Sequence, residues 1–191
     1  RLFLDWAPVS RSEPSAIYNL HYLLALQTAE RLAVRLAHPT DAERWHGRAA
    51  ALRLAVHSVF YAAGRWWDDL ERTTFSQLAA ALAVLTGATA PEDEAALLEQ
   101  IAARSLDPAD EHTPGKMVLA SPFMHHYLFT ALRSRSRDAA VVAIIRLRWG
   151  RWADAGFPTA WENWNVDFPD GSQCHDFSAH PRYHLAAINL R

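Results

Sequence analysis

The sequence lacks the marks of several protein classes. A single cysteine, Cys174, in 191 residues excludes an internal disulfide framework and a zinc ribbon. The 19 basic residues do not exceed the 21 acidic ones, so the charge favours neither nucleic acid nor an anionic membrane as a partner. No apolar run approaches the length of a bilayer span, and no export signal follows Arg1. We therefore expect no membrane partner and a cytoplasmic location.

Half of the residues are hydrophobic, which is enough for one domain with its own core. Apolar residues recur at helical spacing, and no alternation typical of strands extends over any length. Helices are expected at 15–37, 40–63, 74–86, from 91 onward, at 121–133, at 137–155 and in a short segment from 178. The sequence thus predicts an all-α domain of antiparallel helical hairpins, with long loops at 64–73, 105–120 and 156–177.

Four of the eight tryptophans fall between residues 149 and 164. Trp161 and Trp164 lie in a stretch rich in Asn, Asp, Pro and Gly, and they flank Glu162. A carboxylate between two indoles suits general acid or base chemistry, and an aromatic plane on a loop can stack on a sugar ring. Core filling by the tryptophans beside an exposed glutamate remains the alternative.

A second candidate is the segment that runs from Cys174 and His175 to His180 and His184. One cysteine and three histidines are acceptable zinc ligands, but their spacing matches no closed zinc pattern, so we predict no metal and no cofactor. A histidine that orients a sugar hydroxyl is the better functional interpretation of His175, and a hydrogen-bonded structural histidine is the alternative.

Acid–aromatic pairs occur twice more, at Asp5-Trp6 and in the run 66–69, Trp-Trp-Asp-Asp. Such pairs suit sugar recognition, because the ring stacks on a carbon–hydrogen face while the acid accepts hydroxyl protons. Two neighbouring carboxylates without a third ligand are a weak signal for Ca²⁺. A helix-capping aspartate beside a buried tryptophan is the alternative for each pair.

Taken in order, these motifs resemble those of the bacterial α-L-rhamnosidases, glycoside hydrolase family 78. The resemblance covers nearly the whole chain and is collinear. Its elements are Asp5-Trp6, the run 69–87, Ser121-Pro122-Phe123, Trp149-Gly150 with Ala155-Gly156, Thr159 and the run 161–164, and Cys174-His175 with Ser178 and Pro181. The last two elements, at this spacing, are the most specific.

The resemblance implies an (α/α)6 toroid and hydrolysis of terminal α-L-rhamnose with inversion, without a cofactor. By the same resemblance, Glu162 would be the general base and His175 would hold the sugar beside it. Asp5 and one of Trp66 or Trp67 would line the pocket, with Trp161 as a further sugar contact. The substrate partner would be a rhamnosylated glycoside or oligosaccharide.

The family's acid-rich loop, which carries the general acid, has no counterpart in this sequence. Residues 1–191 are therefore expected to be the C-terminal portion of an (α/α)6 catalytic domain, and the chain alone is expected to be inactive. Half a toroid exposes an apolar face, so self-association or association with an N-terminal half is expected. Two alternatives stay open: another (α/α)6 carbohydrate-active enzyme, and a non-catalytic helical module for sugar binding or subunit interaction.

Overall fold

A computed structural model describes residues 3–109, 113–165 and 171–189. Its elements, in chain order, are α1 Ala16–Arg35, α2 Pro39–Phe60, β1 Tyr61–Ala62, β2 Arg65–Trp66, α3 Gln77–Leu85, α4 Pro91–Leu106, α5 His125–Ser134, α6 Asp138–Arg148, α7 Gly150–Asp154, the 3₁₀ turn η1 Asp176–Ala179 and α8 Pro181–Asn189. The prediction of an all-α domain is confirmed. The only strands in the described residues pair as a two-stranded antiparallel hairpin.

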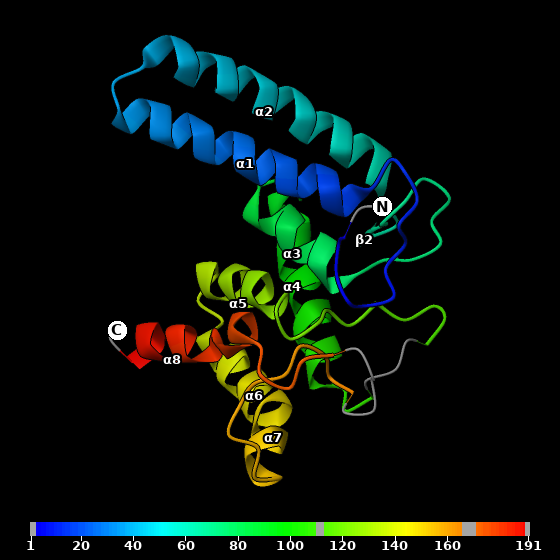
Figure 1. Cartoon of the computed structure of the whole chain (residues 1–191). Helices are drawn as coiled ribbons and strands as arrows, with labels where there is room; N and C mark the ends of the chain where they lie inside the picture. Colours follow the sequence, from blue (N-terminus) through cyan, green and yellow to red (C-terminus); the bar gives the residue numbers. More distant parts are fainter. Residues whose placement is uncertain (1–2, 110–112, 166–170, 190–191) are drawn as a thin grey trace.

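Helices α1 and α2 form a long antiparallel hairpin along one side of the molecule (Figure 1). The side chain of Ser15 caps α1 by accepting a hydrogen bond from the Tyr18 backbone N–H. Helix α2 begins one residue before the expected start at residue 40, and Thr40 is not its N-cap. Proline occupies the first position of α2, where the lack of a backbone N–H costs no hydrogen bond because that N–H would have no partner in the helix. The N-cap is His38, whose side chain makes no capping bond.

Helix α3 is the centre of the core and packs against α1, α4 and α5. Every residue from Gln77 to Val84 is buried, and most are alanine or leucine. Small side chains let neighbouring helices approach from several directions, which explains burial on all sides. Its N-cap is Ser76 rather than the expected Thr74, and Ser76 Oγ accepts from the Ala79 N–H at 3.1 Å.

The C-terminal half holds α5 to α8 on the side of α3 away from α1 and α2 (Figure 1). The single helix expected over 137–155 is two helices, which meet at Trp149 and Gly150. The break is explained in part by Gly150, because glycine has low helix propensity. In addition, the Trp149 indole is bound to the 3₁₀ turn, since its Nε1–H donates to the Ser178 carbonyl at 2.8 Å. Among the described residues, no helix is both long and apolar enough to cross a membrane.

Candidate active site

The chain around Glu162 folds back on itself. The Glu162 N–H donates to the Ser172 carbonyl at 2.8 Å, and the His175 N–H donates to the Ala160 carbonyl at 2.9 Å. The Thr159 hydroxyl adds a bond to the Gln173 carbonyl at 2.5 Å. These bonds place residues 160–162 beside residues 172–175. Glu162 and His175, which are thirteen positions apart, therefore lie together.

The two side chains form a half-buried acid–imidazole pair. His175 Nε2 lies 3.6 Å from Glu162 Oε1, and the side chains are 18% and 16% exposed, respectively. Glu162 Oε2 accepts the Ser172 N–H at 2.9 Å, while His175 Nδ1 lies 3.0 Å from the Ser178 hydroxyl. Each partner is thus oriented by a second group, yet both keep solvent access. The two side chains thus lie close together, while their binding of one sugar ring stays a prediction.

An aromatic wall flanks this pair. The rings of Phe123 and Phe177 lie 6.3 and 5.5 Å from the His175 ring, centroid to centroid, and 5.1 Å from each other. Phe177 is 65% exposed. Behind the wall, both phenylalanines line an open cavity together with His126, His180 and Tyr183. Neither Glu162 nor His175 lines this cavity, so the phenylalanines separate it from the acid–imidazole pair.

The tryptophans of this region pack among themselves. Trp152 stacks on Trp161 and Trp164, with centroids 5.8 and 5.5 Å away. Trp164 also donates its indole N–H to the Ala120 carbonyl at 2.7 Å, which pins the loop to the segment before α5. Trp161 is 2% exposed. No face of its indole is open to a sugar in this structure, so the alternative of core filling describes its position.

Asp5 lies buried beneath the wall rather than on its surface. Its Oδ2 accepts the Ser121 N–H at 3.1 Å, and Ser121 is two residues before Phe123. Burial raises the pKa of the Asp5 carboxyl. Burial also raises the pKa of a second acid, Asp68, to about 6. The negative charges of Asp69 and Asp5 raise the pKa of Asp68 further. Asp5 therefore fixes the backbone of Ser121, close to Phe123 of the aromatic wall.

Trp66 and Trp67 lie at the β1–β2 hairpin, beside α2 and α3. Trp66 is 1% exposed and donates its indole N–H to the Thr89 hydroxyl at 2.9 Å. Trp67 is half-buried, packs on Phe75 at 5.4 Å and donates to the Ala62 carbonyl. Their described contacts are with the hairpin and the core, not with Glu162 or His175. Convergence of these tryptophans with the acid–imidazole pair remains a prediction.

Sequence reasoning named Ser178 only as part of the Cys-His motif, and it did not single out Ser172 or Phe177. Ser172 acts through its backbone N–H, which no side-chain pattern signals. Phe177 follows the Cys-His motif by two residues, and no pattern in the sequence marks it separately from that segment. The zinc-ligand set considered for residues 174–184 also divides: Cys174 is exposed, His175 faces Glu162, and His180 and His184 meet His126 of α5.

The chain is thus a domain of packed helices that carries an acid–imidazole pair on a loop. The family model for the bacterial alpha-L-rhamnosidase six-hairpin glycosidase domain matches residues 2–188, and the chain belongs to that family.

Two solved structures are similar to the chain. The family 78 rhamnosidase of Bacillus sp. GL1 superimposes with a TM-score of 0.80 and 24% identity, covering 98% of this chain and 21% of that one. A Klebsiella oxytoca rhamnosidase with rhamnose bound gives a TM-score of 0.78 and 24% identity, covering 99% of this chain and 36% of that one. The chain thus spans roughly a fifth to a third of these relatives. No curated protein sequence matches it.

Proposed function

We propose that this chain is the C-terminal portion of an (α/α)6 catalytic domain that hydrolyses terminal α-L-rhamnosides with inversion. The observation that carries the proposal is the oriented Glu162–His175 pair, 3.6 Å apart, on a loop of a domain that belongs to the rhamnosidase family. Rhamnose in the Klebsiella relative supports the substrate class.

In this mechanism Glu162 is the general base. It accepts a proton from water as the water oxygen bonds to the anomeric carbon and the bond to the aglycone oxygen breaks. The leaving oxygen takes a proton from a general acid N-terminal to Arg1. Inversion needs the two carboxyl groups about 6.5–9.5 Å apart, so that water fits between the base and the sugar.

His175 positions the sugar next to the base. Its Nε2 faces Glu162, and the Ser178 hydroxyl fixes the ring through Nδ1. Phe123 and Phe177 supply apolar surface for the carbon–hydrogen face of the sugar and for the aglycone. Substrate contacts by Asp5, Trp66, Trp67 and Trp161 stay predictions, and their burial favours a supporting role for Asp5, Trp66 and Trp161.

The test compares Glu162→Gln with the parent in a protein that carries the residues encoded upstream of Arg1. Glutamine keeps the size of the side chain but cannot accept the proton of water, so kcat on a chromogenic α-L-rhamnoside should fall about 10²–10⁴-fold. KM should change only a few-fold. The exposed Glu71→Gln is the matched control and should retain parental kcat.

Product analysis separates the alternatives. Proton NMR of the fresh product should show the β anomer first, because water attacks the face opposite the aglycone. Turnover of another glycoside, such as a glucuronide, in place of rhamnosides would favour a different carbohydrate-active enzyme. Rhamnose binding without turnover in the longer protein would favour a non-catalytic module. Unchanged kcat in Glu162→Gln would exclude Glu162 as the base.

A further inference from the structure

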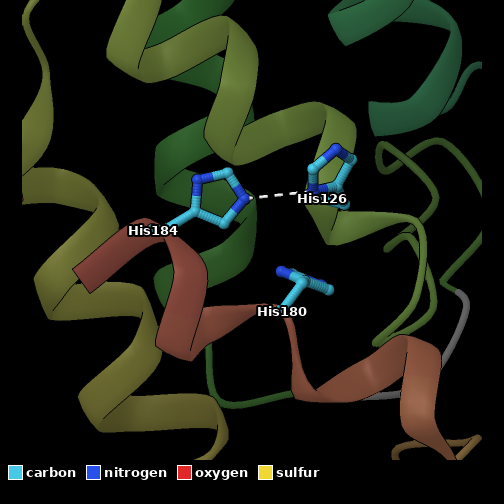
Figure 2. A group of neighbouring side chains, drawn as sticks. All are labelled: His126, His180 and His184. Atoms are coloured by element: carbon cyan, nitrogen blue, oxygen red, sulfur yellow. Dashed lines mark hydrogen bonds between the residues drawn. The ribbon is translucent and has the colours of Figure 1, made fainter. Parts of the chain in front are cut away.

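Three histidines, from α5, from α8 and from the residue before α8, gather behind the aromatic wall. His126 lies in the first turn of α5, while His180 immediately precedes α8 and His184 lies one turn into it. One ring nitrogen from each lies within 4.8 Å of the other two. Figure 2 shows His126 and His184 facing each other across a hydrogen bond, with His180 below them.

Two of the nitrogens already have the separation that a metal ion imposes. His184 Nε2 and His126 Nδ1 are 3.2 Å apart. With metal–nitrogen bonds of about 2.0–2.1 Å, two ligands of a tetrahedral ion lie about 3.3–3.4 Å apart. A ring nitrogen of His180 lies within 4.8 Å of one ring nitrogen of each of the other two histidines, and a side-chain adjustment brings it to the same spacing.

His180 has the hydrogen-bonding pattern of a metal ligand. Its Nε2 lies 2.9 Å from the Pro122 carbonyl. A carbonyl only accepts, so Nε2 carries the hydrogen and Nδ1 has a free lone pair. Nδ1 is buried and has no hydrogen-bond partner among the described residues. Metal-bound histidines characteristically donate their second ring N–H to such a carbonyl or to a carboxylate.

The cluster also has an open side. His126 and His180 line the cavity shared with Phe123, Phe177 and Asp176, whereas His184 is fully buried beneath them. Three protein ligands with one position toward a cavity leave room for water as the fourth ligand. An ion can therefore enter, and exchange, from the cavity.

Positive charge opposes metal binding here, from Arg182, which lines the same cavity, and from Arg133. Arg133 Nη1 lies 3.3 Å from His184 Nδ1, and a guanidinium can only donate. His184 Nδ1 therefore accepts, and Nε2 carries the hydrogen that points at His126. For Nε2 to bind an ion, that hydrogen must move to Nδ1, and Arg133 must turn toward Asp138, whose Oδ1 is 3.4 Å from Arg133 Nε.

We propose that His126, His180 and His184 bind one divalent transition-metal ion of the zinc type, which ties α8 to α5. The site is separate from the Glu162–His175 pair and does not depend on the proposed hydrolase activity. Imidazole nitrogens suit zinc, copper, nickel and cobalt, and they do not suit calcium or magnesium.

The test titrates the chelator-treated 191-residue chain with ZnCl₂ by calorimetry and with CoCl₂ by visible absorption. We expect one zinc per chain with a dissociation constant below about 10 µM, and cobalt absorption typical of tetrahedral nitrogen coordination. MgCl₂ should give no heat of binding. Zinc should also raise the melting temperature, because it binds the folded chain only.

Variants locate the ion. His126→Gln and His180→Gln should each weaken zinc binding at least about 100-fold. His46→Gln removes a histidine of the α1–α2 hairpin and should keep parental affinity. Arg133→Gln should tighten binding, since its amide oxygen can accept the hydrogen on His184 Nδ1.

Far-UV circular dichroism checks that each variant is folded. His126 is only half-buried, so His126→Gln decides the matter even where a change at His184 unfolds the chain. The proposal is overturned by the absence of 1:1 binding in the parent. It is equally overturned if folded His126→Gln binds zinc as the parent does, or if His46→Gln loses as much affinity as His126→Gln.

Discussion

Ser178 determines the orientation of the His175 ring. It is fully buried, its hydroxyl lies 3.0 Å from His175 Nδ1, and its carbonyl accepts the Trp149 indole N–H. Without the hydroxyl, the ring can turn away from Glu162 while the backbone contact to Trp149 remains. The serine is therefore a positioning residue for the histidine.

Ser178→Ala should lower kcat/KM on α-L-rhamnosides about 10-fold in the upstream-extended protein, the lower end of the effect of groups that orient a functional histidine. The loss should come mainly through KM, because the proposed role of His175 is to hold the sugar and Glu162 retains its own Ser172 contact. Steady-state kinetics measure this division. Ser58→Ala, on the exposed face of α2, is the control. An equal loss of kcat/KM in that variant would show that the orientation of His175 is not the cause.

At the scale of the element, α3 is held by a buried amide as well as by apolar packing. Gln77 Nε2 lies 2.8 Å from both the Ile101 carbonyl and the Ser105 hydroxyl, and its Oε1 accepts the Ala120 N–H at 2.9 Å. One side chain thus joins α3 to α4 and to the segment that leads into the aromatic wall.

Gln77→Leu should lower the free energy of unfolding by about 2–4 kcal/mol, because it leaves the buried Ala120 N–H without its acceptor and removes the bonds that Nε2 makes to α4. Urea denaturation followed by far-UV circular dichroism measures the change. Gln100→Leu, at an exposed position of α4, is the matched control and should change stability by less than about 0.5 kcal/mol. Similar losses in both variants would show that the buried network is not the cause.

The helices could be predicted because their apolar spacing and their prolines act locally. Pro91 begins α4 as expected, and Gly87 follows α3 with a φ of 65°. Gln77 shows the limit of such reasoning. Its hydrogen-bond partners lie 24 to 43 positions away along the chain. Long-range hydrogen bonds leave no periodic trace in a sequence.

The same limit applies to the site. The motif predicted Glu162 and His175 together, because both belong to segments that resemble one family. It did not predict that Trp66 and Trp161 are buried, since a tryptophan in a polar loop can face either way. Nor could it bring His126 to His180 and His184, because the packing of α5 against α8 is a tertiary contact.

At the scale of the whole molecule, a buried acid sets part of the pH dependence of stability. Asp68 accepts hydrogen bonds from the Ser76 and Thr74 hydroxyls, yet burial raises its pKa to about 6, against 3.8 in the unfolded chain. The folded state therefore holds more protons between these values. Its stability falls as the pH rises through that range, and the full cost is present above pH 6 or so.

The contribution of Asp68 to the free energy of unfolding should accordingly become more stabilising by about 2 kcal/mol when the pH is lowered from 7.5 to 4.5. The measured quantity is the difference in unfolding free energy between the parent and Asp68→Asn, which cannot titrate. Leu97→Ala lacks any titratable change and should differ from the parent by the same amount at both pH values. A difference between the parent and Asp68→Asn that stays constant with pH would contradict the shifted pKa.

The α1–α2 hairpin bears on assembly. It exposes large apolar side chains, namely Tyr18, Tyr22, Leu32, Val34, Leu36, Leu54 and Val59. Apolar surface of this kind favours association with further protein surface. Self-association of the chain, or its burial against an N-terminal half, remains the proposal for this side of the molecule.

The stacked tryptophans give the site an optical signature of its own. Trp152 lies between Trp161 and Trp164 with interplanar angles of 29° and 25°, and these two residues flank Glu162. Indoles this close and this nearly parallel couple their electronic transitions, so they should produce a paired band in near-UV circular dichroism. That band reports whether the loop around Glu162 is seated, independently of any substrate. Loosening of this loop can then be followed in real time while the rest of the helices stay folded.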